Sequence, residues 1–284
     1  MTVADHSPAA LIRAVISDVD GTLVTKDKRL TARTIAAAAA LHAKGIVFAI
    51  ISSRPPRGLR MFVEPLALST PLIGFNGGML VMPDETVLAQ HLIDPQIARR
   101  AVAAIAAHGA QVWIFSGGNW LIRDASGPYI GLEERTVQFA PTTVGEFGAS
   151  LDSAAKIVGV SDDFALLARC EGAIQGLLAR DASVVRSQPY YLDITHPLAN
   201  KGEAVRTLAA QLDIPAAEIA TIGDGGNDIA MFAESGFSIA MGNASPEVKA
   251  RAQCVTGSNE EDGFAAAMDR FILARAPSVV GAAS

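Results

Sequence analysis

The sequence contains little cysteine and few charged residues, and each shortage excludes a class of protein. Cys170 and Cys254 are the two cysteines in 284 residues, and neither belongs to a CxxC pair or a Cys/His cluster. A disulfide framework and a structural zinc site are therefore not expected, and a reducing cytoplasm is the expected compartment. Charged residues make up 18% of the chain and give a formal net charge of −6, without any Lys/Arg-rich block. We therefore expect no nucleic-acid partner and no attraction to an anionic membrane.

Long apolar runs are also missing. The Ala-rich segment after Ile35 meets His42 and Lys44 within a few residues, well short of the roughly 18 to 20 apolar residues that a membrane-spanning helix needs. The first ten residues lack the basic start and long apolar core of a secretory leader. We therefore expect a soluble protein without a signal peptide.

Apolar side chains are nevertheless abundant enough for more than one core. Hydrophobic residues make up 50% of the chain, and a chain of this length normally forms two compact units or one unit with a large insertion. Short apolar runs alternate with helical patterns towards both ends, which predicts an α/β domain with a parallel sheet. The expected strands there are residues 11–17, 46–52, 71–75, 219–223 and 237–242.

The middle of the chain has a different pattern. From about residue 92 to 189 we predict a helix, a hairpin turning at Gly117 and Gly118, an irregular Thr/Gly-rich stretch, and then a strand, a helix and two strands. Hairpins mixed with helices indicate an α+β unit inserted into the parallel domain. The predicted division is a core at residues 1–84 and 191–284 with an inserted domain at residues 85–190.

Two acids follow the first predicted strand, in the segment AVISDVDGTLV. Side chains two residues apart point to the same side of a strand, so Asp18 and Asp20 start out together at its carboxyl end. Ligands bind at that edge of open α/β sheets. Solvent-facing acids at an ordinary turn explain a lone DxD equally well, so further motifs decide its interpretation.

Two more stretches place polar groups at a strand end or a helix start. The segment AIISSRP ends a strand with Ser52, Ser53 and Arg54, and such hydroxyls either form turns and caps or donate to a phosphate oxygen. Lys201 lies in the first turn of a predicted helix, where a cation is unfavourable for the helix dipole unless an anion lies nearby. A solvated lysine is the alternative.

The segment TIGDGGNDIAMF is the most specific of these stretches. Asp224 follows a predicted strand, two glycines permit a tight turn, and Asn227 and Asp228 then begin a helix. Such clustered oxygen ligands resemble a hard-cation site, since Mg²⁺ is usually held by carboxylates together with water and a phosphate oxygen. A simple capped turn would explain Asn227 or Asp228 but not Asp224.

In chain order, DVDGTL, SSR, NKG and GDGGND resemble the four motifs of the haloacid dehalogenase (HAD) superfamily of phosphohydrolases. The insertion lies between the second and third motifs and follows FNGG at residues 75–78, which is similar to the Cof-type subfamily with a type II cap. In the insertion the resemblance rests on position and element types alone. Ser53 departs from the family's second motif, which commonly reads Thr-Gly-Arg. The resemblance implies a Rossmann-like parallel-sheet core with an inserted α+β cap domain that sets substrate specificity.

The same resemblance implies a Mg²⁺-dependent phosphatase that hydrolyses small phosphorylated metabolites, such as sugar phosphates, through an aspartyl-phosphate. Asp18 would be the nucleophile, and Asp20 would protonate the leaving group and later accept a proton from water. Lys201 and Ser52 would hold the transferring phosphoryl oxygens. Residues expected to contact substrate are Ser53, Arg54, Asn76, Gly77 and Asn227.

Mg²⁺ would be bound by Asp18, the Asp20 carbonyl and Asp224. Asn227 and Asp228 would either complete the metal site or orient Lys201. His196, Trp113, Trp120, Tyr190 and Tyr191 are expected to have structural roles in or near the cap.

Two other functions remain open. A phosphosugar mutase of the same superfamily would return the phosphoryl group to a sugar, and a catalytically silent protein would use the fold for binding or regulation. A silent protein should have lost a key group, yet Asp18, Asp20, Lys201 and Asp224 are all present.

Overall fold

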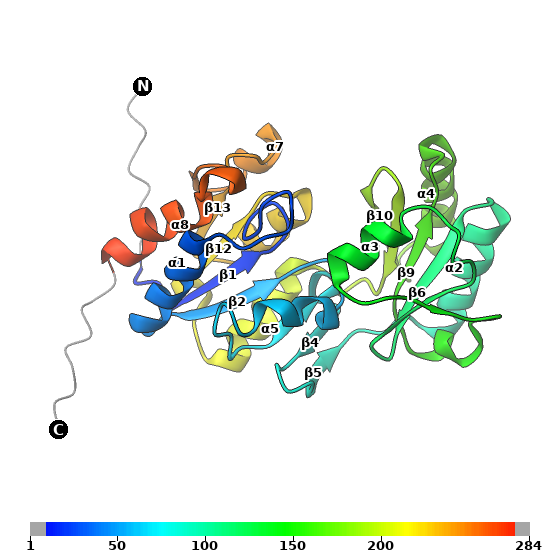
Figure 1. Ribbon diagram of the computed structural model, residues 1–284, viewed down its shortest axis with the longest axis horizontal. Helices are drawn as coiled ribbons and strands as arrows, with labels where there is room; N and C mark the ends of the chain where they lie inside the picture. Colours follow the sequence, from blue (N-terminus) through cyan, green and yellow to red (C-terminus); the bar gives the residue numbers. More distant parts are fainter. Residues whose placement is uncertain (1–9, 276–284) are drawn as a thin grey trace.

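The structure is a computed structural model of the 284-residue chain and describes residues 10–275. The expectation about a leader peptide concerns residues that lie almost entirely outside this range. Two sheets, each with its own helices, lie side by side along the long axis of the molecule (Figure 1). Within the described residues, no helix is both long and apolar enough to cross a membrane.

The first sheet has eight strands in the order β14-β13-β12-β1-β2-β3-β4-β5. Strands β14 to β3 in this order run parallel, and the hairpin of β4 and β5 closes one edge antiparallel. The bounds are β1 Ala14–Asp18, β2 Val47–Ile51, β3 Leu72–Gly74, β4 Met79–Val81, β5 Val87–Gln90, β12 Ile219–Gly223, β13 Phe237–Ala240 and β14 Cys254–Val255.

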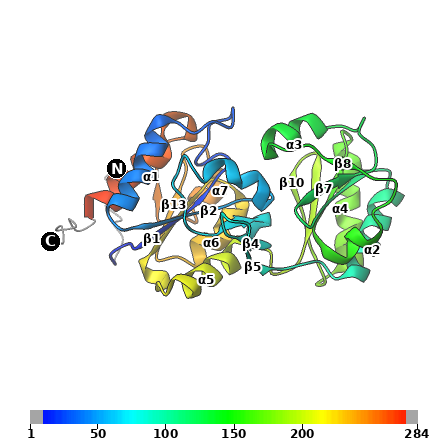
Figure 2. The same cartoon turned by 60° about the horizontal axis from the view of Figure 1, so that its bottom comes forward.

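Helices cover both faces of this sheet, which explains why its central strands are apolar throughout. Val15 packs with α1 (Ala32–Ala43) and α8 (Gly263–Ala267), whereas Ile16 packs on the other face with α5 (Lys201–Leu212) and α6 (Ile229–Ala233). Figure 2 shows α1 and α5 on opposite sides of the sheet. The α/β fold class with a parallel-sheet core is therefore confirmed.

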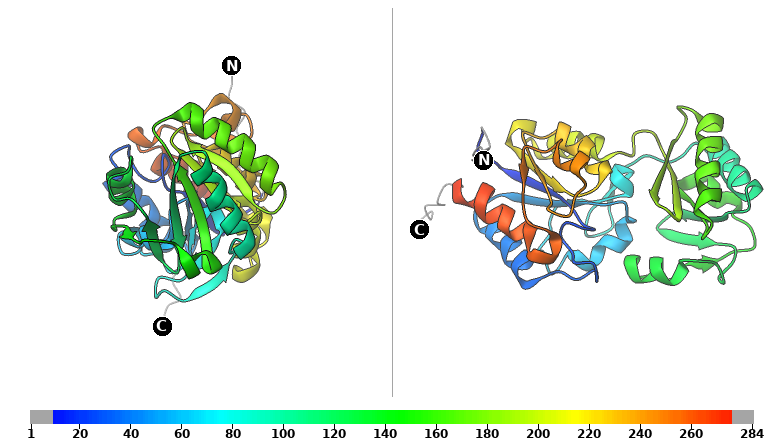
Figure 3. Two further views of the ribbon diagram at one scale, coloured as in Figure 1. Left: turned by 90° about the vertical axis from the view of Figure 1, so that its right-hand side faces the viewer. Right: turned by 90° about the horizontal axis from the view of Figure 1, so that it is seen from above.

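The second sheet has six strands in the order β10-β11-β9-β6-β7-β8. Its α2 (Pro95–Ala107) and α4 (Phe164–Leu178) cover the face that points away from the first sheet (Figure 3). The predicted hairpin turns at Gly117 and Gly118 as expected. The strands are β6 Gln111–Ser116, β7 Asn119–Ile122, β8 Thr142–Thr143, β9 Ala154–Val160, β10 Ser183–Gln188 and β11 Tyr191–Thr195.

One helix of the inserted unit was not predicted. The stretch expected to be irregular contains α3 (Ile130–Val137), which begins after Tyr129 at φ +64°. Gly131 and Thr136 are weak helix formers and Val137 is the one buried residue of the helix, so neither propensity nor periodicity marks it. Its contacts with the segment after β2 hold it in place instead. Trp113 and Trp120 are buried on the same side of the second sheet as α3, consistent with a core role.

The predicted boundaries at 84/85 and 190/191 do not coincide with the ends of the sheets. Both boundaries fall at the turns of hairpins. Turn residues interrupt the apolar pattern of the sequence even where the chain continues into the next strand of the same sheet. Strand β5 still pairs with β4 in the first sheet, and β11 pairs with β9 and β10 in the second. The two connections therefore begin near His91 and His196, whose rings stack with centroids 5.3 Å apart.

Candidate active site

The parallel strands bring the sequence motifs to one edge of the first sheet. Asp18 ends β1 and is paired in register with Ile51, so Ser52 follows at the same level on the neighbouring strand. Strand β12 lies on the other side of β1 and ends at Gly223, immediately before Asp224. Asp18, Ser52 and Asp224 are thus carried by three adjacent strand ends.

Lys201 enters this edge from the start of α5. Its side chain is fully buried, and Nζ donates to Asp18 Oδ1 at 2.5 Å and to Asp228 Oδ1 at 2.6 Å. Burial lowers the pKa of Lys201, but the attraction of Asp18 and Asp228 outweighs it and leaves that pKa raised. The buried lysine is therefore an ammonium group at neutral pH, which answers why a cation occupies this end of a helix.

The FNGG segment fixes the start of α5. Gly77 has φ +104°, and a Cβ there would lie 2.8 Å from both the Asn200 carbonyl oxygen and Ala204 Cβ. Asn200 caps the helix by accepting a hydrogen bond from the Glu203 N–H. Gly77 thus has a packing reason for its identity in addition to the substrate contact expected of it.

Three carboxylates crowd together beside Lys201. Oxygens of Asp18, Asp224 and Asp228 all lie within 4.8 Å of one another. Burial raises the pKa of Asp18 well above its usual value, and repulsion from Asp228 and Asp224 adds to this while Lys201 opposes it. Burial, followed by Asp228, raises the pKa of Asp224 to about 6. A hard divalent cation fits this set of oxygen donors. It would balance the negative charge of three carboxylates, which Lys201 alone does not balance.

Asp228 has both oxygens engaged by protein donors. Oδ1 accepts from Lys201, and Oδ2 accepts the N–H groups of Asp224 at 2.9 Å and Gly225 at 2.8 Å. Of the two roles expected for Asp228, orienting Lys201 is the one with a direct contact. Asn227 donates to Asn76 Oδ1 at 3.0 Å, which ties the turn after β12 to the FNGG segment.

Asp224 is oriented by residues that the motif analysis did not single out. Asn243 Nδ2 donates to Asp224 Oδ2 at 3.0 Å and to the Gly21 carbonyl at 2.9 Å, and Thr22 Oγ1 donates to Asp224 Oδ1 at 3.4 Å. Gly21 has φ +83°, and a Cβ at this position would lie 2.3 Å from Asp224 Oδ2. This close approach explains why glycine follows the two acids of the first motif.

Asp20 is held by two cations. Arg54 donates to it through Nε and Nη2, both at 2.7 Å, and Lys28 Nζ donates at 2.6 Å. Burial raises the pKa of Asp20, but hydrogen bonding and charge from Arg54, and then from Lys28, outweigh it and lower the pKa to about 2. In this arrangement Asp20 is a carboxylate, which suits a proton acceptor. To donate a proton, Asp20 must first be released by Arg54 and Lys28 and become protonated.

Arg54 also joins the inserted unit to the edge of the first sheet that carries the motifs, the candidate catalytic edge. Its Nη1 donates to the Thr136 carbonyl oxygen at 2.7 Å, near the end of α3. The guanidinium expected to contact substrate thus donates hydrogen bonds to Asp20 and to the Thr136 carbonyl oxygen of α3. Ser52 is buried with Oγ accepting the Arg54 N–H at 3.2 Å, and Ser53 beside it is half-buried.

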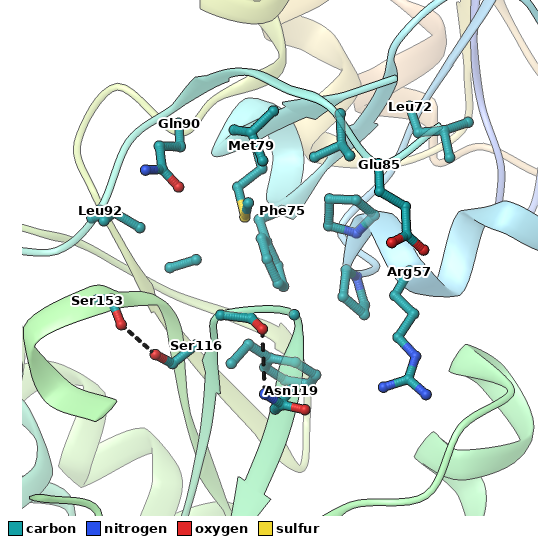
Figure 4. Close-up of a pocket in the computed structure, with 18 of the residues that line it drawn as sticks. Arg57, Leu72, Phe75, Met79, Glu85, Gln90, Leu92, Ser116, Asn119 and Ser153 are labelled. Carbon is teal, nitrogen blue, oxygen red and sulfur yellow. Dashed lines mark hydrogen bonds between the residues drawn. The ribbon is translucent and has the colours of Figure 1, made fainter. Parts of the chain in front are cut away.

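A cavity of about 630 Å³ lies between the two units. The β4–β5 hairpin, the segment after β2 and the β6–β7 turn form its walls, and Phe75, Met79, Leu92, Ser116 and Asn119 project into the region (Figure 4). Asp18, Asp20, Lys201 and Asp224 are not among its lining residues. The cavity therefore lies beside the candidate catalytic edge and is not lined by its charged groups.

Comparisons with known proteins agree with the sequence motifs and the fold. The sequence model of haloacid dehalogenase-like hydrolases matches residues 15–268. The HMP-PP phosphatase of Cronobacter sakazakii is 28% identical over 235 residues, which cover 82% of this chain and 85% of that protein.

Solved structures show the same architecture. A haloacid dehalogenase-like hydrolase from Bacteroides thetaiotaomicron superposes with a TM-score of 0.85 at 24% identity, covering 91% of this chain and 99% of the other. A sugar phosphatase of HAD subclass IIB gives a TM-score of 0.80 at 25% identity and covers 92% of this chain and 99% of its own.

Proposed function

The chain belongs to the haloacid dehalogenase-like hydrolase family, and from this we propose that it is a Mg²⁺-dependent phosphatase of small phosphorylated metabolites. The observation that carries the proposal is Asp18, a strand-end carboxylate in contact with the buried ammonium of Lys201 and beside Asp224. The Cronobacter relative is named for a phosphorylated metabolite, and the subclass IIB neighbour is named a sugar phosphatase. Sugar phosphates and other phosphorylated metabolites are therefore the substrates to test first.

In the first step of this mechanism, Asp18 attacks phosphorus and the bond from phosphorus to the ester oxygen breaks. An aspartyl-phosphate forms and the leaving group takes a proton from Asp20. In the second step Asp20 accepts a proton from water, the water oxygen attacks phosphorus, and the bond to Asp18 breaks to release phosphate. Asp20 thus regains the proton that it gave up in the first step. In that protonated state it would be released from Arg54 and Lys28, which hold it as a carboxylate in this structure.

Lys201 and Ser52 would bind the transferring phosphoryl oxygens. The ammonium group is already fixed by Asp18 and Asp228, so little reorganisation is needed when negative charge develops. Asp18, Asp224 and the Asp20 carbonyl would hold the metal, with Asp228 adjacent. When bound, Mg²⁺ supplies positive charge that keeps Asp18 ionised and reduces its repulsion of an anionic ester.

We also propose a division of labour between the two sheets. The residues named for phosphoryl transfer all belong to the first sheet and its loops, whereas the inserted unit faces their edge through α3. The insertion would act as a cap that selects the leaving group. The scarcity of cysteine supports a cytoplasmic site of action.

Release of inorganic phosphate from a panel of phosphorylated metabolites tests the activity. With Mg²⁺ present we expect release from several members of the panel, and excess chelator should stop it until Mg²⁺ is restored. Isomerised phosphosugar without free phosphate would indicate a mutase. Binding without any product would indicate a silent protein and would overturn the proposal.

A further inference from the structure

The face of the second sheet that is turned towards α3 contains a polar cluster. On β11, Leu192 and Ile194 pack beneath α2 and α4, so Asp193 between them points to the opposite face. On β9, Ile157 also packs beneath these helices, so Lys156 shares the face of Asp193. Strands β9 and β11 are direct neighbours in the sheet.

Charged side chains meet on this face. Lys156 Nζ lies 2.8 Å from Asp193 Oδ2, and each side chain is 10% exposed. Glu133 of α3 completes the cluster, since its Oε2 accepts the Tyr191 hydroxyl at 3.3 Å. Burial raises the pKa of Glu133, and the charges that act on this group include Lys156, Asp193 and Arg54. The cluster is therefore within electrostatic reach of the arginine that holds Asp20.

Unpaired polar atoms are concentrated on the same face. Among the described residues, Asp193 Oδ1, Trp113 Nε1 and Trp120 Nε1 are the buried side-chain polar atoms that have no hydrogen-bond partner. Trp113 pairs in register with Val158, which pairs with Asp193, so these two side chains lie in one row across three strands. Buried polar atoms are nearly always paired, and a concentration of exceptions needs an explanation.

A purely structural ion pair does not explain these atoms. Burying Lys156 with Asp193 already requires both charges to leave water, and an unpaired carboxylate oxygen makes that burial more costly. A ligand that brings its own hydrogen-bonding groups would satisfy the oxygen, and two N–H groups of Lys156 remain after its contact with Asp193.

The position of the cluster points to the leaving group as this ligand. Glu133 lies three residues before Thr136, so about one helical turn separates the cluster from the contact of α3 with Arg54. Arg54 in turn contacts Asp20, the proposed proton donor to the leaving oxygen. The face therefore lies on the side of the catalytic edge from which the leaving group would extend.

We infer that Asp193 and Lys156 recognise the leaving group of the substrate, which is an uncharged, hydroxyl-rich group such as a polyol or sugar. This inference rests on the proposed phosphatase function and assigns its specificity. A hydroxyl both donates and accepts, which matches an unpaired carboxylate oxygen beside an ammonium group. The cluster sets two acids, Asp193 and Glu133, against one base, Lys156, which disfavours a second phosphate or a carboxylate on the leaving group.

The test measures kcat/KM for three probes: glucose 6-phosphate, fructose 1,6-bisphosphate and p-nitrophenyl phosphate. Asp193→Asn and Lys156→Met remove one charge each while nearly preserving side-chain shape. Glu171→Gln is the matched control, because Glu171 pairs with Arg186 at 2.7 Å on α4 and β10 of the same unit. Thermal unfolding of each variant checks that the fold is retained.

We expect both variants to lower kcat/KM for glucose 6-phosphate about tenfold or more, mainly through KM, and to change that for p-nitrophenyl phosphate less than twofold. The control should change neither, and the wild type should favour the monophosphate over the bisphosphate. Equal losses on both monoesters, or no loss on either, would overturn the inference while leaving the phosphatase function intact. A wild type that hydrolyses none of the probes and no member of the metabolite panel would overturn the proposed function, and this inference with it.

Discussion

A carboxylate attacks phosphorus only while it is ionised, and Asp18 is subject to opposing influences on its charge. Burial and the neighbouring acids favour the protonated form, whereas Lys201 at 2.5 Å favours the ionised form. A cation bound by Asp18 and Asp224 would favour the ionised form of Asp18, which is the form that can attack phosphorus.

Replacing Asp18 with Asn should abolish turnover and leave the fold intact. The amide oxygen can still accept from Lys201, but a carboxamide is a poor nucleophile, so we expect kcat to fall by at least about three orders of magnitude. Steady-state phosphate release and thermal unfolding measure the two effects. Asp27→Asn is the control, since that side chain is 78% exposed. More than a few percent of wild-type activity, once deamidation to Asp is excluded, would show that another group is the nucleophile.

The raised pKa of Asp224 predicts how the stability of the metal-free protein changes with pH. Its pKa of about 6 in the folded protein lies above the ordinary value of 3.8, so the folded state binds this proton more tightly than the unfolded chain. The proton on Asp224 therefore stabilises the folded state fully below about pH 4, and this stabilisation is lost as pH rises through about 6. With chelator present, Asp224→Asn should therefore raise the melting temperature more at pH 7.5 than at pH 4.5.

Mg²⁺ should reverse this pattern in the wild type. We expect it to raise the wild-type melting temperature more at pH 7.5 than at pH 5, and to raise that of Asp224→Asn much less. Differential scanning fluorimetry across pH measures both proteins. A metal-induced increase of equal size in the two would place the cation away from Asp224.

The residues that sequence reasoning found and missed differ in how they reach the site. Asp18, Ser52, Lys201 and Asp224 lie at strand ends or a helix start, where a parallel sheet dictates that they meet. Lys28 also contacts Asp20, and Thr22 and Asn243 contact Asp224, but these three residues belong to loops whose paths depend on tertiary packing. A lysine eight residues after an acid has no local signal, so its pairing with Asp20 required the structure.

The turn after β1 sets how closely Asp224 can approach the first motif. Gly21 and Gly45 both have positive φ, of +83° and +68°, but Gly45 has nothing within 4 Å of its would-be Cβ. Alanine at either position should therefore lose about 1 kcal/mol to backbone strain. Only Gly21→Ala should also displace Asp224, lower stability further and raise the Mg²⁺ concentration required for half-maximal activity. Equal Mg²⁺ requirements in both variants would contradict this account of the turn.

Element α3 shows where sequence patterns stop being informative. Its apolar face amounts to Val137, so there is no periodic signal of the kind that identified α1 and α5. Contacts with another unit hold it in place, and these include the hydrogen bond from Arg54. Except for β8, the strands of the insertion were predicted from the sequence, whereas the polar cluster of Lys156 and Asp193 depends on which strands become neighbours.

At the scale of the whole molecule, the proposed division of labour predicts what removing the insertion would do. The stacked rings of His91 and His196 show that the two connections lie side by side, so a short Gly/Ser linker can replace residues 93–194 without stretching the first sheet. Phe75 packs on Phe115 across the units, and Phe75→Ser in the shortened chain would limit aggregation through newly exposed apolar surface. Circular dichroism and a monodisperse elution profile must first show that this protein folds.

We then expect kcat/KM to fall far more for the preferred metabolite than for p-nitrophenyl phosphate. The loss of α3 and the second sheet removes contacts with the leaving group and the exclusion of water, but it leaves the phosphoryl-binding edge in place. A folded, capless protein that kept the wild-type ranking of substrates would locate specificity in the first sheet and contradict a selective role for the insertion.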